Sequence, residues 1–105
     1  MTLGARLRTM TSVEDEACRV RDYIRKNCLG RLSCGAQTRR RSAYISNFAR
    51  ILLELEQMFE FYESHYDHEF DGDLDHMQEM ADALDAETWI VVDKAWRVVR
   101  EFEKY

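Results

Sequence analysis

Three histidines lie close together and are the side chains best suited to metal chemistry in this chain. His65, His68 and His76 share one stretch with several glutamates and aspartates. Imidazole and carboxylate groups can together bind a divalent transition metal. A di-metal carboxylate centre uses Glu-x-x-His pairs from two helices, and the sequence contains no such pair. We expect no metal site and no cofactor, and keep a metal-binding helical protein centred on His65-His76 as the alternative.

The segment from Asp67 to Gln78 resembles a calcium-binding loop in its spacing of carboxylates. Acidic side chains occupy the odd positions of its first nine residues, and Gly72 occupies the sixth. An EF-hand loop ends on a bidentate glutamate at the twelfth position, where this chain has Gln78. The segment is therefore predicted to be an acidic turn between two helices.

A run of arginines, Arg39-Arg41, is the candidate for binding phosphate. The chain as a whole is acidic, with a net charge of −5, and no aromatic platform for stacking bases lies among these arginines. We expect no direct contact with nucleic acid, although a nucleic-acid-associated protein using Arg39-Arg41 is a second alternative. The three cysteines, an odd number, argue against a disulfide framework and for a reducing compartment.

Charge is distributed very unevenly along the chain. Residues 51–93 contain fourteen Asp and Glu and no Lys or Arg, whereas residues 1–50 contain eleven Lys and Arg and four acids. Such a division bears on partners and electric fields more than on fold. No serine, histidine and acid arrangement and no glycine-rich phosphate loop is present, so we predict that the protein is not an enzyme.

The acidic residues form a row on the predicted central helix. Glu56, Glu60, Glu63 and Asp67 recur every three or four residues, about 4.5–6 Å apart along the axis. Phosphates of one DNA strand advance about 3.4 Å each. A row of carboxylates can therefore compete for a protein surface built for phosphates. The predicted partner-binding face continues into the acidic turn with Glu69, Asp71, Asp73 and Asp75.

Helices must position these residues, because the chain has no proline, only four glycines and no strand-like alternation. The pattern predicts helices from Ser12 to Gly30, over about 39–67, over a short segment after Gly72, and from Asp85, which can cap it, to about Lys104. The first helix is predicted to start with a cap at Thr11 or Ser12 and to bury one apolar stripe, Val13, Ala17, Val20, Ile24 and Cys28. The prediction is an all-α, four-helix bundle-like domain with one long central helix. Residues 1–11 are expected to form a flexible N-terminal arm, and residues 12–105 a single helical domain.

More apolar side chains are present than the helical stripes need. Leu53 and Phe61 fall off the main stripe of the central helix, and Trp89 and Trp96 widen the apolar arc of the last helix. These four residues are the predicted interface of a homodimer.

The function expected from these features is protein binding. The composition is similar to that of small acidic inhibitors, such as phage anti-restriction and anti-CRISPR proteins and toxin-immunity proteins. We expect an inhibitor or decoy that occludes a basic, nucleic-acid-binding protein surface. No secretory signal and no membrane span are recognisable, so we expect a cytoplasmic protein.

Overall fold

Three helical arms make up the described part of the chain, residues 12–67 and 74–105, in the computed structural model. The first arm runs without a break through α2 (Val13–Tyr23), the π-helical η1 (Ile24–Leu29) and α3 (Gly30–Leu32). The other two arms are α4 (Arg39–Asp67) and α5 (Leu74–Lys104). The all-α prediction is confirmed for the described residues. The predicted flexible arm, 1–11, lies outside them.

The first arm begins where the sequence predicts and ends later. Ser12 caps it, since its hydroxyl accepts a hydrogen bond from the Asp15 amide at 3.1 Å. The predicted stripe is entirely buried, with Val13, Ala17, Val20, Ile24 and Cys28 all at most 5% exposed. Gly30 was predicted to end the helix, and that prediction is wrong. Gly30 has helical backbone angles, and the helix continues to Leu32.

The chain turns between the first arm and α4 at Gly35, and α4 then begins with a cap at Thr38. Gly35 has a φ of +93°, a conformation that glycine adopts most easily. Thr38 then caps α4, because its hydroxyl accepts from the Arg41 amide at 3.1 Å. The predicted bounds of the central helix, about 39–67, match α4.

The fourth predicted helix does not exist as a separate element, because α5 is continuous from Leu74 to Lys104. Asp85 was predicted to cap a new helix. Its carboxylate instead accepts a hydrogen bond from the Tyr62 hydroxyl of α4 at 2.6 Å, within an uninterrupted helix. No glycine or proline occurs between Leu74 and Lys104, so nothing in the backbone forces a break.

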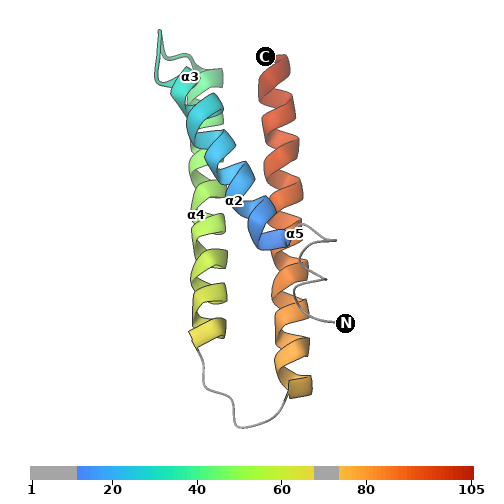
Figure 1. The fold of residues 1–105 in the computed structure, drawn as a ribbon. Helices are drawn as coiled ribbons and strands as arrows, with labels where there is room; N and C mark the ends of the chain where they lie inside the picture. Colours follow the sequence, from blue (N-terminus) through green and yellow to red (C-terminus); the bar gives the residue numbers. More distant parts are fainter. Residues whose placement is uncertain (1–11, 68–73) are drawn as a thin grey trace.

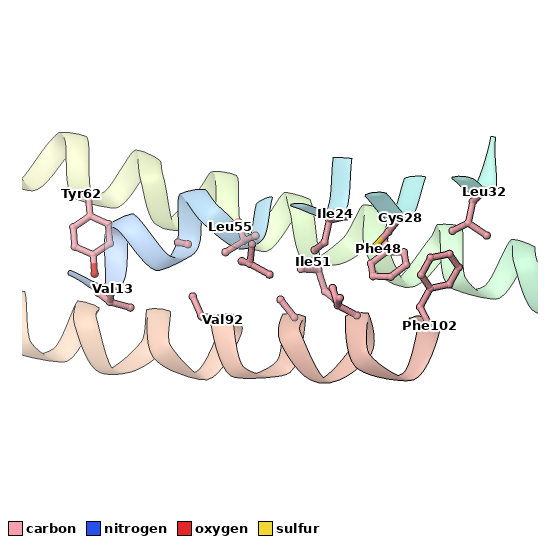
Figure 2. Packing of buried hydrophobic residues seen from close by; sticks show 14 residues of the cluster. Val13, Ile24, Cys28, Leu32, Phe48, Ile51, Leu55, Tyr62, Val92 and Phe102 are labelled. Atoms are coloured by element: carbon pink, nitrogen blue, oxygen red, sulfur yellow. The ribbon is translucent and has the colours of Figure 1, made fainter. Parts of the chain in front are cut away.

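The three arms pack side by side in an elongated molecule of 56 × 25 × 17 Å (Figure 1). The helices α4 and α5 form an antiparallel hairpin, and the first arm lies across one face of it. One core runs along the contact, from Val13, Tyr62 and Val92 at one end to Leu32, Phe48 and Phe102 at the other (Figure 2). This arrangement decides which side chains remain free to bind a partner.

Candidate protein-interaction surfaces

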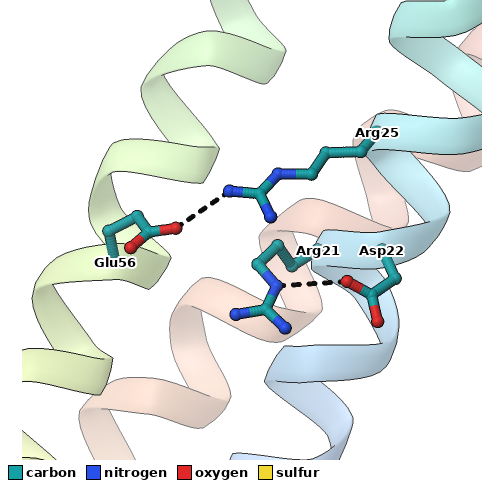
Figure 3. A network of polar contacts seen from close by, with 4 residues as sticks. All are labelled: Arg21, Asp22, Arg25 and Glu56. Carbon is teal, nitrogen blue, oxygen red and sulfur yellow. Dashed lines mark hydrogen bonds and ion pairs between the residues drawn. The ribbon is translucent and has the colours of Figure 1, made fainter.

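The acidic row on α4 begins with a residue that already has a cation beside it. Glu56 accepts a hydrogen bond from Arg25 of the first arm, with Nη2 and Oε1 3.0 Å apart (Figure 3). Glu60 and Glu63, one and two turns further on, are exposed and make no ion pair within the described residues. The structure thus leaves Glu60 and Glu63 as the accessible part of the row.

The rest of the predicted acidic face is only partly described. Asp67 lies in the last turn of α4, and Asp75 is exposed in the first turn of α5. Glu69, Asp71 and Asp73 lie outside the described residues. Further along α5, Glu79, Asp82 and Glu87 are exposed as well. We call the C-terminal half of α4 and the N-terminal half of α5 the acidic end of the molecule.

In the described residues, this acidic block forms ion pairs with cations at Glu54 and Glu56, and the Arg21 guanidinium lies 4.9 Å from the Phe59 ring centroid. Lys94 donates to Glu54 at 3.2 Å, and Arg25 reaches Glu56. Both pairs are about half exposed, and such surface pairs contribute at most about 1 kcal/mol each. Residues 57–67 of α4 and 74–93 of α5 contain no Lys or Arg, so the carboxylates in these two ranges, apart from Asp93 next to Lys94, have no lysine or arginine beside them on their own helix.

The arginine run Arg39-Arg41 is used within the protein. A single nitrogen of Arg41, Nη2, donates to the carbonyls of Arg31, Leu32 and Cys34, which holds the open end of α3. The guanidinium of Arg40 lies over the Tyr105 ring, 4.8 Å from its centroid. These contacts join α3, the start of α4 and the end of α5. We call this part of the molecule the basic end; its cations are Arg31, Arg39, Arg40, Arg41, Arg100 and Lys104.

A partly buried polar cluster lies within the acidic end, where α4, α5 and the start of α2 meet. The Tyr62 hydroxyl donates to Asp85, and the Thr88 hydroxyl donates to the Leu84 carbonyl at 2.7 Å. Burial and the hydrogen bond to Asp85 raise the pKa of Tyr62 above its usual range. Burial and the nearby carboxylates of Asp15 and Asp85 raise the pKa of Glu14, in the first turn of α2. The Tyr62–Asp85 hydrogen bond therefore links α4 to α5 at this level of the hairpin.

The cysteines and histidines are not gathered into a site in the described residues. Cys28 is fully buried, and burial raises the pKa of its thiol to about 11, so it is a core side chain. His65 lies in α4 and His76 in α5, while His68 is outside the described residues. No group of three or more His, Cys, Asp or Glu side chains in the described part of the chain is placed to hold a metal ion.

The four residues predicted to form a dimer interface lie on different faces. Trp96 packs against Tyr23 of the first arm, with ring centroids 5.4 Å apart, and Trp89 lies two turns before it on the same side of α5. Leu53 and Phe61 remain 71% and 47% exposed. Eight residues separate them, a rotation of about 80° around α4, so they do not form one patch.

Sequence patterns missed the face of the α4/α5 hairpin that lies opposite the first arm. Glu56, Phe59 and Trp96 contact the first arm, whereas the Glu54–Lys94 pair lies on the other side of both helices. Residues seven apart share a face, so Phe61 lies with Glu54, and Glu87 with Lys94. We call this the open face; it also carries Arg50, Met80, Ile90 and Arg97. Ile90, 69% exposed, is its most exposed apolar side chain.

No protein-family model matches the chain, and no similar curated protein or solved structure was found. None of the helices in the described residues has an apolar stretch long enough to cross a bilayer.

Proposed function

We propose that this protein binds a basic, nucleic-acid-binding protein through its acidic end and blocks the surface that the partner uses for nucleic acid. The observation that carries the proposal is the fate of the acidic block in three dimensions. The helices α4 and α5 run antiparallel, so the carboxylates on the C-terminal half of α4 and the N-terminal half of α5 lie toward the same end of a 56 Å molecule.

The geometry supports a binding surface in two ways. Glu60 and Glu63 are exposed on a straight helix that holds them at a fixed spacing, as a mimic of regularly spaced phosphates requires. The block also lacks the interspersed lysines of an ordinary soluble helix, which would form i, i+4 pairs with these glutamates. The mutual repulsion of these carboxylates opposes folding, and binding to a cationic surface would relieve it.

Self-association is the second part of the proposal. The open face and Leu53 leave large apolar side chains in water. A homodimer would cover part of this surface and leave the acidic row of α4, on another side of the helix, free for the partner.

The test uses the protein as bait in a lysate of its source cells. A specific partner should be captured at low salt, be released by competing duplex DNA, and lose its own affinity for DNA when the bait is added. The double variant Glu60→Lys, Glu63→Lys should bind this partner at least about tenfold more weakly, because steering by opposed fields is lost.

Glu101→Lys is the control, since it changes an exposed acid by the same charge at the other end of the molecule. It should bind the partner as the wild type does. Two results would contradict the proposal: equal affinity of the Glu60→Lys, Glu63→Lys variant for the partner, or direct binding of duplex DNA by the wild type through its basic end.

A further inference from the structure

The open face is the side of the α4/α5 hairpin that lies opposite the first arm. The first arm occupies the opposite face, and contacts on that side bury Val92, Ala95 and Val99. On the open face Ile90 is 69% exposed, Met80 52% and Phe61 47%. Exposed apolar side chains on one face of a two-helix layer indicate a missing layer.

Charge on the open face indicates what that layer is. Toward the basic end it carries Arg50, Lys94 and Arg97, partly offset by Glu101 and by Glu54, which pairs with Lys94. Toward the acidic end it carries Glu79 and Glu87. A surface that is positive at one end and negative at the other complements itself after a half turn about an axis perpendicular to its length.

We infer that two copies of this chain pack open face to open face in antiparallel orientation, so that the two α4/α5 hairpins form two stacked layers of two helices each. The inference rests on the proposed self-association and adds its face and its direction. A parallel pair would bring the two acidic ends together, where the described parts of the helices offer no cation.

The antiparallel arrangement sets a specific register. With Ile90 beside the two-fold axis, Arg97 of one copy lies level with Ala83 of the other. Glu79 and Glu87 of that second copy are then one turn away on either side, about 6 Å along the axis. Each Arg97 thus lies within reach of Glu79 and Glu87 of the other copy, and Ile90 meets its own counterpart. The same register sets Glu101 level with Glu79 of the other copy, and Arg97, one turn from Glu101, is the cation that can contact both carboxylates.

The face is tested by a matched pair of variants in sedimentation equilibrium. Ile90→Asp places a charge in the proposed contact and should raise the dimer dissociation constant at least about tenfold. Leu53→Asp, at a residue of nearly equal exposure, 71% against 69%, lies on another side of the hairpin and should leave it unchanged. Circular dichroism should show that both variants are folded.

The direction is tested by cross-linking in a Cys18→Ala, Cys34→Ser background, which removes the two accessible thiols. Glu79→Cys and Glu101→Cys are equidistant from Ile90. A mixture of these two chains should form disulfide-linked dimers under mild oxidation, and neither chain alone should do so. Arg97→Glu should weaken the dimer, and adding Glu79→Arg and Glu87→Arg should restore it.

The results separate the proposals. A chain that is monomeric at about 100 µM overturns both the self-association and this inference, but leaves the acidic partner surface to be judged by the Glu60→Lys, Glu63→Lys bait. A dimer that Ile90→Asp does not weaken overturns only the open face. A dimer in which Glu79→Cys or Glu101→Cys links to its own kind overturns only the antiparallel direction.

Discussion

At the scale of single residues, Arg41 shows how a charged motif can have a structural role. Three adjacent arginines have the composition of a phosphate site, yet Arg41 points back to the end of α3 and donates to three carbonyls there. Helix ends leave carbonyl groups without partners, and a cation near them also interacts favourably with the helix dipole. The side chain therefore fastens the turn between the first arm and α4.

Replacing Arg41 should destabilise the fold, whereas replacing Arg39, in the same run, should not. Arg41→Ala leaves the carbonyls of Leu32 and Cys34 without this donor, so the free energy of unfolding should fall by about 1–3 kcal/mol. Arg39→Ala removes an exposed arginine from the same run and should change it by less than about 0.5 kcal/mol. Urea denaturation measures both; equal effects of the two substitutions would refute the capping role.

At the scale of elements, the two glycines near the first turn have opposite roles. The sequence places both near the end of a helical pattern, and Gly30 comes first. In the fold Gly30 is an ordinary helical residue with a φ of −59°, while Gly35 makes the turn with a φ of +93°. Only the second position needs the freedom of glycine.

Alanine substitutions at these glycines should therefore have opposite signs. Gly30→Ala should raise the free energy of unfolding by about 0.4–1 kcal/mol, because alanine favours the helix and its Cβ would lie an ordinary 3.7 Å from the nearest atom, the Arg25 carbonyl oxygen. Gly35→Ala should lower it by about 1–2 kcal/mol, because a Cβ strains the left-handed backbone. Thermal and urea unfolding should agree on the two signs. A stabilising Gly35→Ala would mean that the turn has another conformation.

At the scale of the whole molecule, folding turns a charge division along the sequence into a charge division in space. The antiparallel hairpin brings the acidic residues of late α4 and early α5 to one end and gathers the arginines of α3, early α4 and late α5 at the other. The screening length at physiological salt is about 8–10 Å, so exposed carboxylates one helical turn apart still repel one another. Replacing these glutamates should therefore raise the free energy of unfolding and weaken the proposed binding to a basic partner.

Charge reversal should consequently stabilise one end and destabilise the other. Glu63→Lys places a cation one turn from Glu60 and near the C-terminus of α4, so the free energy of unfolding should rise by about 0.5–1 kcal/mol. Glu101→Lys adds a cation beside Arg97, Arg100 and Lys104 and should lower it, but by a smaller amount, because the C-terminus of α5 attracts the new cation. Denaturation at low salt gives the largest difference, and 0.5 M salt should shrink it. A destabilised Glu63→Lys protein would show that this glutamate is not under repulsion.

The sequence by itself determined the helices and most of their inward faces. The all-α class, the bounds of the central helix, a cap at Thr11 or Ser12 and the buried stripe from Val13 to Cys28 follow from local rules, because capping and helical periodicity involve residues only three or four apart. The tertiary structure decided the rest. Asp85 is predicted from the sequence as a helix cap, but it lies inside α5, where its carboxylate accepts a hydrogen bond from the Tyr62 hydroxyl, 23 residues away in the sequence. Glu56 reads as part of a free acidic row but has Arg25 beside it. The open face depends on which side of the hairpin the first arm covers, and that choice comes from packing between distant segments, which no local pattern encodes.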